Sequence, residues 1–256
     1  MSDLDDLIKR IGDPIEFLIA HFFDIIYREI RLNTFKWASE NLEQYWSNIS
    51  GGKKIVDDGS RETLTEYVRY EMIFTNMELA EDLVRVLKTY RYGCPDRVAT
   101  YRSSINAKSY YQSLEGQKDE FFIDILSIQP GSYGEDPNTP PPKYVEEGIH
   151  KFRDQILKIA DFYDRYYDLY NQYKHGNRLA YMTSPEDDGT NTPFVVSFPI
   201  LDGASGLRNQ IKVNKIYDVE NDTKIGYKIL GIAQSVKNNW KNQIDNHRDF
   251  KIDIPT

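Results

Sequence analysis

The segment that follows Lys143 constrains the fold of this chain more than any other part of the sequence. Its apolar residues recur at the spacing of one face of an α-helix: Ile149, Phe152, Ile156, Ile159, Ala160, Tyr163, Tyr167 and Tyr170. The stripe predicts one long helix that ends at Gly176, because glycine favours a helix stop. Such a helix must pack against other elements along its whole length.

Two helices are predicted before the glycine pair at residues 51–52. The first starts at residues 13–14, where a capping aspartate precedes a proline in the first turn, and it runs to about Arg31. Residues 33–34, an asparagine and a threonine, then offer a break and a new cap. The second helix follows and ends before the glycine pair.

Three further helices are predicted in the next part of the chain. Ser60 caps a long helix that ends near Gly93, Pro95 opens the next helix, and a short helix covers residues 119–128. Each of them carries an apolar stripe that needs a neighbour to cover it. This need favours a helical bundle over independent units.

A proline-rich segment, residues 129–142, divides the chain. Its prolines and glycines exclude a helix or a central strand. The segment fits a linker between two domains and fits a surface loop within one bundle equally well. We expect a helical N-terminal region over residues 1–128 and a second region over residues 143–256, packed together as one domain.

The sequence pattern changes after the long helix. Short runs rich in β-branched or aromatic residues at 178–182, 193–200 and 210–219 predict a small antiparallel sheet or a pair of hairpins. A last amphipathic helix is predicted from about Thr223 to Ile244. The expected fold class is therefore mainly α: a helical bundle with a small antiparallel β appendage near the C-terminus and a final helix.

Charge and hydropathy bear on the partners of the chain. The formal net charge of −8 disfavours broad attraction to nucleic acid or anionic lipid, because such a surface repels phosphates on average. The most apolar run, Phe17 to Ile26, is interrupted by His21 and Asp24 and is shorter than the roughly 20 apolar residues that cross a bilayer. No membrane partner is expected. The single cysteine, Cys94, and the lack of a basic, apolar leader predict a cytoplasmic location.

Several signatures of bound cofactors and metals are missing from the sequence. It contains no Walker A loop, no dinucleotide-binding glycine fingerprint, no CxxC pair and no HExxH motif. We therefore expect no cofactor. Asp164, Asp168 and His175 cannot share one metal ion, because along a straight helix they span about 16 Å. No metal site is expected either.

A polar face borders the apolar stripe near the end of the long helix. Asp164, Asp168, Asn171 and His175 follow one another at spacings of four, three and four residues, so they share one side of the helix. A histidine there can act as a general acid or base, since its ordinary pKa of about 6.5 lies near neutrality. The same pattern also fits a solvated helix face, with His175 near the helix C-terminal dipole.

The string YNQYKHG, from Tyr170 to Gly176, resembles the signature helix of the HEPN superfamily. In that family an arginine, usually followed by a polar residue such as asparagine, precedes a histidine by a few positions, and dimerisation brings two such helices together. Many members cleave RNA without a metal ion, whereas others are non-catalytic binding or assembly modules. Asn171 and His175 match the polar and histidine positions, and Tyr170 stands where the family has arginine.

The resemblance implies a function and a set of site residues. It implies a homodimer that binds RNA, or cleaves it as a metal-independent endoribonuclease, in stress or antiviral defence. The implied catalytic residues are His175, Asn171 and Arg178, and the implied substrate-binding residues are Lys174, Tyr170 and Tyr173. Arg178 and Lys174 would supply the positive charge of the missing arginine.

Two other functions remain open. The chain can be a non-catalytic helical interaction or regulatory module that engages another protein, with Asn171 and His175 in a polar contact between helices. It can also be a ligand-binding domain that uses the tyrosines of the long helix: Tyr163, Tyr166, Tyr167, Tyr170 and Tyr173. Tyrosines in such a pattern are more often amphipathic core residues.

Overall fold

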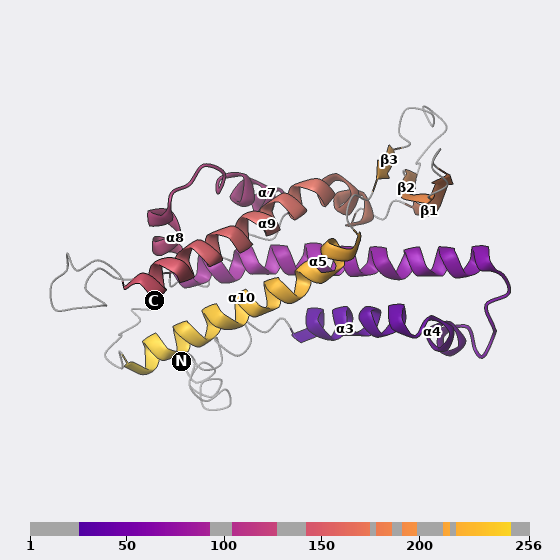
Figure 1. Cartoon of the computed structure of the whole chain (residues 1–256), viewed down its shortest axis with the longest axis horizontal. Helices are drawn as coiled ribbons and strands as arrows, with labels where there is room; N and C mark the ends of the chain where they lie inside the picture. The colour runs from indigo at the N-terminus through magenta and orange to yellow at the C-terminus, as the bar shows by residue number, and fades with distance from the viewer. Residues whose placement is uncertain are drawn as a thin grey trace, which may run out of the picture. The chain divides into compact units, whose positions relative to one another are not determined.

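The computed structural model of the chain is mainly α-helical (Figure 1). Its backbone is described for residues 26–92, 104–126, 142–174, 178–185, 191–198, 212–215 and 219–246. Side chains are described for residues 27–88, 107–123, 125–126, 142–174 and 220–238. The predicted fold class is confirmed at the level of a mainly α helical bundle. Among the helices in these residues, none has both the length and the apolarity that crossing a membrane requires.

The described helices carry the labels of Figure 1. They are α3 (Ile26–Glu40), α4 (Leu42–Ile49), α5 (Asp58–Tyr92), α7 (Ser104–Gln112), α8 (Asp119–Ile125), α9 (Lys143–Lys174) and α10 (Val219–Asn246). α5 and α9 are the longest of them, with 35 and 32 residues. The predicted long helix after Lys143 is therefore confirmed.

Three described strands form one antiparallel sheet in the order β1-β2-β3. They are β1 (Arg178–Pro185), β2 (Asn191–Phe198) and β3 (Lys212–Lys215). Ala180 of β1 pairs with Val196 of β2, and Val196 pairs with Val213 of β3. That this sheet packs as an appendage on the bundle stays a prediction, since the side chains of its strands lie outside the described residues.

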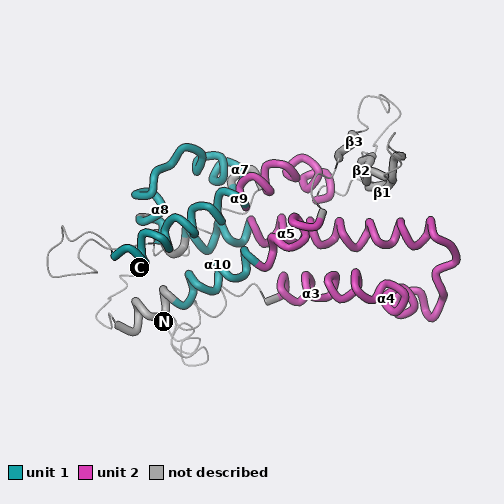
Figure 2. The backbone as a smooth tube through the Cα atoms, in the orientation of Figure 1, with its two compact units in different colours: residues 1–26, 81–158, 228–256 teal, residues 27–80, 159–227 magenta. Residues whose placement is uncertain are grey.

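The chain divides into two compact units, which Figure 2 colours separately. Unit 1 comprises residues 1–26, 81–158 and 228–256, and unit 2 comprises residues 27–80 and 159–227. α5, α9 and α10 each contribute one part to unit 1 and another part to unit 2. The predicted domain organisation stays a prediction, and the proline-rich segment lies outside the described residues except for Pro142.

The predicted helix break at residues 33–34 is wrong, because α3 continues through both residues. The hydroxyl of Thr34 donates a hydrogen bond to the carbonyl of Ile30, 2.8 Å away, so it bonds back into its own helix instead of capping a new one. The break falls at Asn41, whose side-chain amide donates to the carbonyl of Trp37 at 3.0 Å. The predicted start of the first helix lies outside the described residues.

Other helix ends fall near the predicted ones. α4 ends before Gly51 and Gly52, whose φ angles of +71° and +89° suit glycine. α5 is capped by Asp57 rather than by Ser60, since the Asp57 carboxylate accepts the Ser60 N–H at 2.7 Å. Hydrogen bonds from Ser60 lower the pKa of Asp57. α10 begins at Val219, inside the last predicted strand, because two acidic residues in its first turn favour a helix start there.

α5 is the central helix of unit 2. Every residue from Tyr70 to Met77 is buried, which is about two full turns, so neighbours surround this segment in all directions. α3, α9 and α10 each contact it within unit 2, through an ion pair, a ring stack and hydrogen bonds respectively. The core of unit 2 therefore forms around α5.

In unit 1, a polar pair and an aromatic pair join α8 to α9. Arg153 donates to the carboxylate of Asp119 at 2.9 Å, and the rings of Phe122 and Phe152 meet edge to face with centroids 6.3 Å apart. On α7, Tyr111 is buried, and burial raises the pKa of its hydroxyl well above the usual value. These contacts anchor the short helices that follow α5.

α10 passes very close to its neighbours in unit 2 at Gly226. Asn76 is fully buried, and its side-chain amide donates to the backbone carbonyls of Asp222 (2.7 Å) and Thr223 (3.1 Å). A Cβ atom at position 226 would lie 2.8 Å from Leu32 Cδ2 and nearer still to Asn76 Oδ1. The two hydrogen bonds hold Asn76 in place, so only glycine fits at this position.

We expect Gly226→Ala to lower the free energy of unfolding by about 1–3 kcal/mol, the usual cost of overpacking a core. The added methyl group must displace either Leu32 or the amide of Asn76. Urea denaturation followed by circular dichroism measures the change. Gly231→Ala is the control on the same helix, because no described atom lies within 4 Å of a Cβ there. The control should gain up to about 1 kcal/mol from helix propensity, and equal changes in the two variants would contradict the close approach.

Candidate functional site at the end of α9

The residues that the HEPN resemblance singles out lie at the end of α9 and just after it. The end of α9 holds four of them: Tyr170, Asn171, Tyr173 and Lys174. His175 lies outside the described residues, and so does the side chain of Arg178, whose backbone begins β1. The catalytic roles of His175, Asn171 and Arg178 stay predictions.

The tyrosines of α9 are mostly core residues. Tyr163, Tyr166 and Tyr170 are each at most 2% exposed, which confirms the core interpretation for these three. The ammonium group of Lys174, an exposed residue, lies over the ring of Tyr170 at 4.7 Å from its centroid. A base can therefore stack on Tyr170 only if the core of unit 2 opens.

Tyr173 is held by contacts within unit 2. Its ring stacks on Phe74 of α5, with centroids 4.1 Å apart and an angle of 19° between the rings. Its hydroxyl accepts a hydrogen bond from Arg31 Nη2 of α3 at 3.2 Å. Burial and the nearby charge of Glu71 raise the pKa of Tyr173, although Arg31 opposes this, so the hydroxyl stays protonated at neutral pH. Tyr173 thus joins three helices.

A group of opposed charges surrounds the hydroxyl of Tyr173. Arg31 donates from Nη2 to Glu71 at 2.8 Å and from Nη1 to Glu78 at 2.8 Å, and Arg28 donates to Glu78 at 2.5 Å. Burial alone would lower the pKa of Arg31, but the bond to Glu71 and the charge of Glu78 outweigh it and raise this pKa. Two cations face two carboxylates here, so the cluster has no net charge to offer a phosphate.

A second buried carboxylate ties α10 to α9. Asp222 is 2% exposed and accepts two bonds from Arg165, at 3.0 and 2.9 Å, and one from the hydroxyl of Tyr166 at 2.6 Å. Burial alone would lower the pKa of Arg165, and the bonds to Asp222 raise it overall. The sequence did not predict this contact, because the two charged residues are 57 positions apart.

The polar face predicted along α9 is solvated over most of its described length. Asp164 and Asp168 are exposed, and Asn171 is half-buried. Within the part of the chain that the structure describes, no group of three or more histidine, cysteine, aspartate or glutamate side chains lies close enough to hold a metal ion. The described part of this face therefore offers one half-buried amide and two carboxylates in water.

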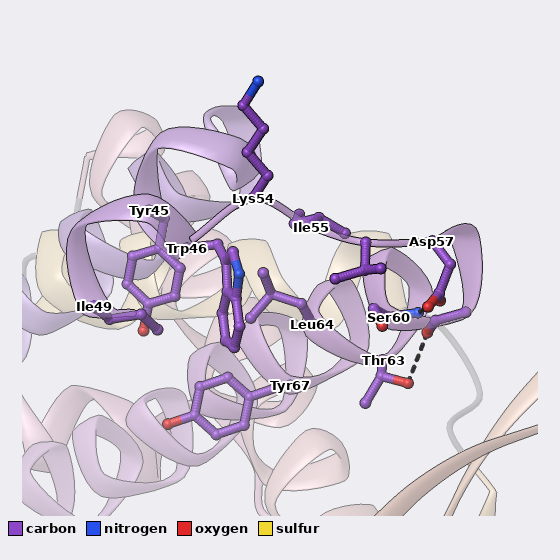
Figure 3. A pocket seen from close by; sticks show the side chains of 12 residues that line it. Tyr45, Trp46, Ile49, Lys54, Ile55, Asp57, Ser60, Thr63, Leu64 and Tyr67 are labelled. Carbon is purple, nitrogen blue, oxygen red and sulfur yellow. Dashed lines mark hydrogen bonds between the residues drawn. The ribbon is translucent and has the colours of Figure 1, made fainter. Parts of the chain in front are cut away.

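A pocket of about 750 Å³ lies elsewhere in unit 2, between α4 and the start of α5 (Figure 3). Its lining is largely apolar and comes from α4, the following loop and the first turns of α5: Tyr45, Trp46, Ile49, Lys54, Ile55, Val56, Asp57, Gly59, Ser60, Thr63, Leu64 and Tyr67. Sequence analysis missed this site. The available signal was the helical spacing of residues 42–49, which predicts an apolar face without indicating what covers it.

Comparison of the chain with protein-family models, with curated proteins and with solved structures finds no match.

Removal of the buried Asp222 carboxylate should destabilise the protein strongly. Asp222→Ala is expected to lower the free energy of unfolding by about 3 kcal/mol, near the low end for breaking a buried ion pair, because Arg165 is partly exposed. Glu220→Ala is the matched control in the same helical turn, since this exposed carboxylate pairs only at the surface with Lys224. Thermal unfolding should separate the two variants, and a neutral Asp222→Ala would refute the importance of the contact.

Substitutions at Tyr173 should separate its hydroxyl from its ring. Tyr173→Phe keeps the stack on Phe74 and loses the bond from Arg31, which should cost about 0.5–1.5 kcal/mol of unfolding free energy. Tyr173→Ala also loses the stack and should cost about 3 kcal/mol. Tyr144 is 72% exposed on the same helix, so the same two changes there should leave the urea midpoint unchanged. Similar midpoints for all four variants would show that Tyr173 does not stabilise the core.

Proposed function

We propose that the chain is a non-catalytic helical binding module, in which the end of α9 serves the packing of unit 2. What carries the proposal is the position of Tyr173, whose ring stacks on Phe74 and whose hydroxyl accepts a bond from Arg31. Tyr170 beside it is fully buried. Two of the three residues expected to contact a substrate are thus engaged inside the protein.

The charge around Tyr173 supports the same proposal. Binding of an RNA backbone depends on uncompensated lysine and arginine side chains that displace counterions from phosphates. Arg31, the nearest described arginine to Tyr173, is held by Glu71 and Glu78 at 2.8 Å each. Its guanidinium therefore neutralises carboxylates of its own chain, and the net charge of the chain, −8, adds no general attraction for RNA.

A second candidate function is cleavage of RNA without a metal by a homodimer, as the HEPN resemblance implies. The observation that favours it is the exposure of Lys174 at the last position of α9, with the half-buried Asn171 one turn before it. Lys174 directly precedes His175, and Asn171 lies four residues before it. In this function His175 transfers the proton of the 2′-hydroxyl, and Lys174 or Arg178 stabilises the charge on the phosphate.

One assay decides between the two candidates. Purified protein is incubated with total RNA, with and without EDTA, and cleavage and binding are both recorded. The proposed module gives no cleavage above that of a His175→Ala sample purified in parallel. The second candidate gives cleavage that survives EDTA and falls by about 100-fold to 10,000-fold in His175→Ala, the usual effect of losing a general acid or base.

His150→Ala is the matched control for this assay. His150 is an exposed histidine on α9 that faces Asp119, so its loss changes a histidine on the same helix without touching the end of α9. Cleavage that His150→Ala retains and His175→Ala loses would overturn the non-catalytic proposal. Light scattering on the same samples measures the mass, and a strictly monomeric mass would contradict the dimer of the second candidate.

A further inference from the structure

α4 has the sequence of an amphipathic helix, but its apolar face is only partly covered. Leu42, Tyr45, Trp46 and Ile49 follow one another at spacings of three, one and three residues, which places them on one side of the helix. All residues of α4 are described, and none of them is buried. Ile49 is 56% exposed. An amphipathic helix normally turns this side to a core, whereas Tyr45, Trp46 and Ile49 of α4 line the pocket.

The pocket has the size and the lining of a small-molecule site. Its volume of about 750 Å³ lies within the roughly 300–1,000 Å³ that is usual for such sites. Figure 3 shows the ring of Trp46 standing between Tyr45, Leu64 and Tyr67. Aromatic rings at such a site favour a flat partner, because offset stacks and edge contacts add to the burial of apolar surface.

The charges at the pocket disfavour an anion. Asp57 is in the lining, and its role as the cap of α5 keeps it ionised. Burial, and then the charge of Glu71, raise the pKa values of Tyr45 and Tyr67, so both hydroxyls are neutral groups at physiological pH. Lys54, the cation of the lining, extends away from the aromatic rings (Figure 3). The site thus combines apolar walls with neutral hydroxyls, one carboxylate, and one lysine that extends away from the rings.

We propose that the pocket between α4 and α5 binds a neutral, flat and largely apolar small molecule. This inference rests on the proposed function, since it names the ligand class of the binding module. The ligand lies against Trp46, Leu64 and Tyr67 and covers the apolar face of α4. Its hydrogen-bonding groups meet the hydroxyls of the lining, and a negatively charged group on it would face the carboxylate of Asp57.

The test uses Nile red, a neutral and flat apolar dye, as the probe. We expect saturable binding of one dye per chain, with a dissociation constant in the micromolar range, measured by dye fluorescence. Thr63 lines the pocket and is exposed, and its hydroxyl donates to the carbonyl of Gly59 at 2.8 Å. Thr63→Phe fills the pocket from α5 and should weaken dye binding at least about tenfold, which is about 1.4 kcal/mol.

Thr34→Phe is the matched control. Thr34 is also exposed on a helix and makes the same kind of bond, to the carbonyl of Ile30 at 2.8 Å, but it does not line the pocket. A second pair covers the case in which Thr63→Phe fails to fold. Ile49 and Ile30 are both 56% exposed, and only Ile49 lines the pocket, so Ile49→Glu should weaken dye binding and Ile30→Glu should not.

Three results would overturn the proposal. The first is dye binding to the wild-type chain that does not saturate, and the second is equal dye binding in the pocket and control variants. The third is a wild-type chain that binds no dye and forms a dimer, together with an Ile49→Glu variant that is a monomer. A second copy of the chain would then occupy the pocket. None of these results depends on RNA cleavage, so the ligand and the non-catalytic function can fail separately.

Discussion

The packing of unit 2 depends on one buried carboxylate, that of Asp222. Removing a carboxylate from water costs several kcal/mol unless charged and hydrogen-bonding partners replace the water. Arg165 and Tyr166 of α9 supply these partners, and they can do so only when the first turn of α10 lies against α9. The backbone carbonyl of Asp222 also accepts a bond from Asn76 of α5. One residue thereby fixes three helices, and Gly226, one turn later, permits the close approach.

Periodicity predicted most of the described helices, because apolar spacing reports which side of a helix faces a core. It also favoured core positions for the tyrosines of α9. It failed at Thr34, whose hydroxyl can either cap a helix or bond back into one, so that packing decides between the two. Periodicity did not predict the contact between Arg165 and Asp222, because no local pattern links residues 57 positions apart.

The sequence indicated where along the chain the candidate site lies. It did not indicate which residues surround the side chains of that site. The string YNQYKHG is the same whether its tyrosine rings contact a substrate or pack in a core. What decides the role of Tyr173 is its contact with Arg31, a residue 142 positions away, together with the stack on Phe74. The pocket presents the opposite case: the spacing around Trp46 predicts an apolar face, and only the structure shows that this face is partly open.

The hydrogen bond from Asn76 to Asp222 joins positions 146 apart, and this separation matters while the protein is being synthesised. α5 leaves the ribosome well before the parts of α9 and α10 that cover it in unit 2. Until they follow, the segment of α5 from Tyr70 to Met77, which is buried on all sides in the finished protein, stays open to water and to other chains. Contacts between such distant positions also slow folding, because a long loop must close first. In the unfinished chain, the stretch of α5 around Asn76 therefore lacks its hydrogen-bond partner until the first turn of α10 has been made.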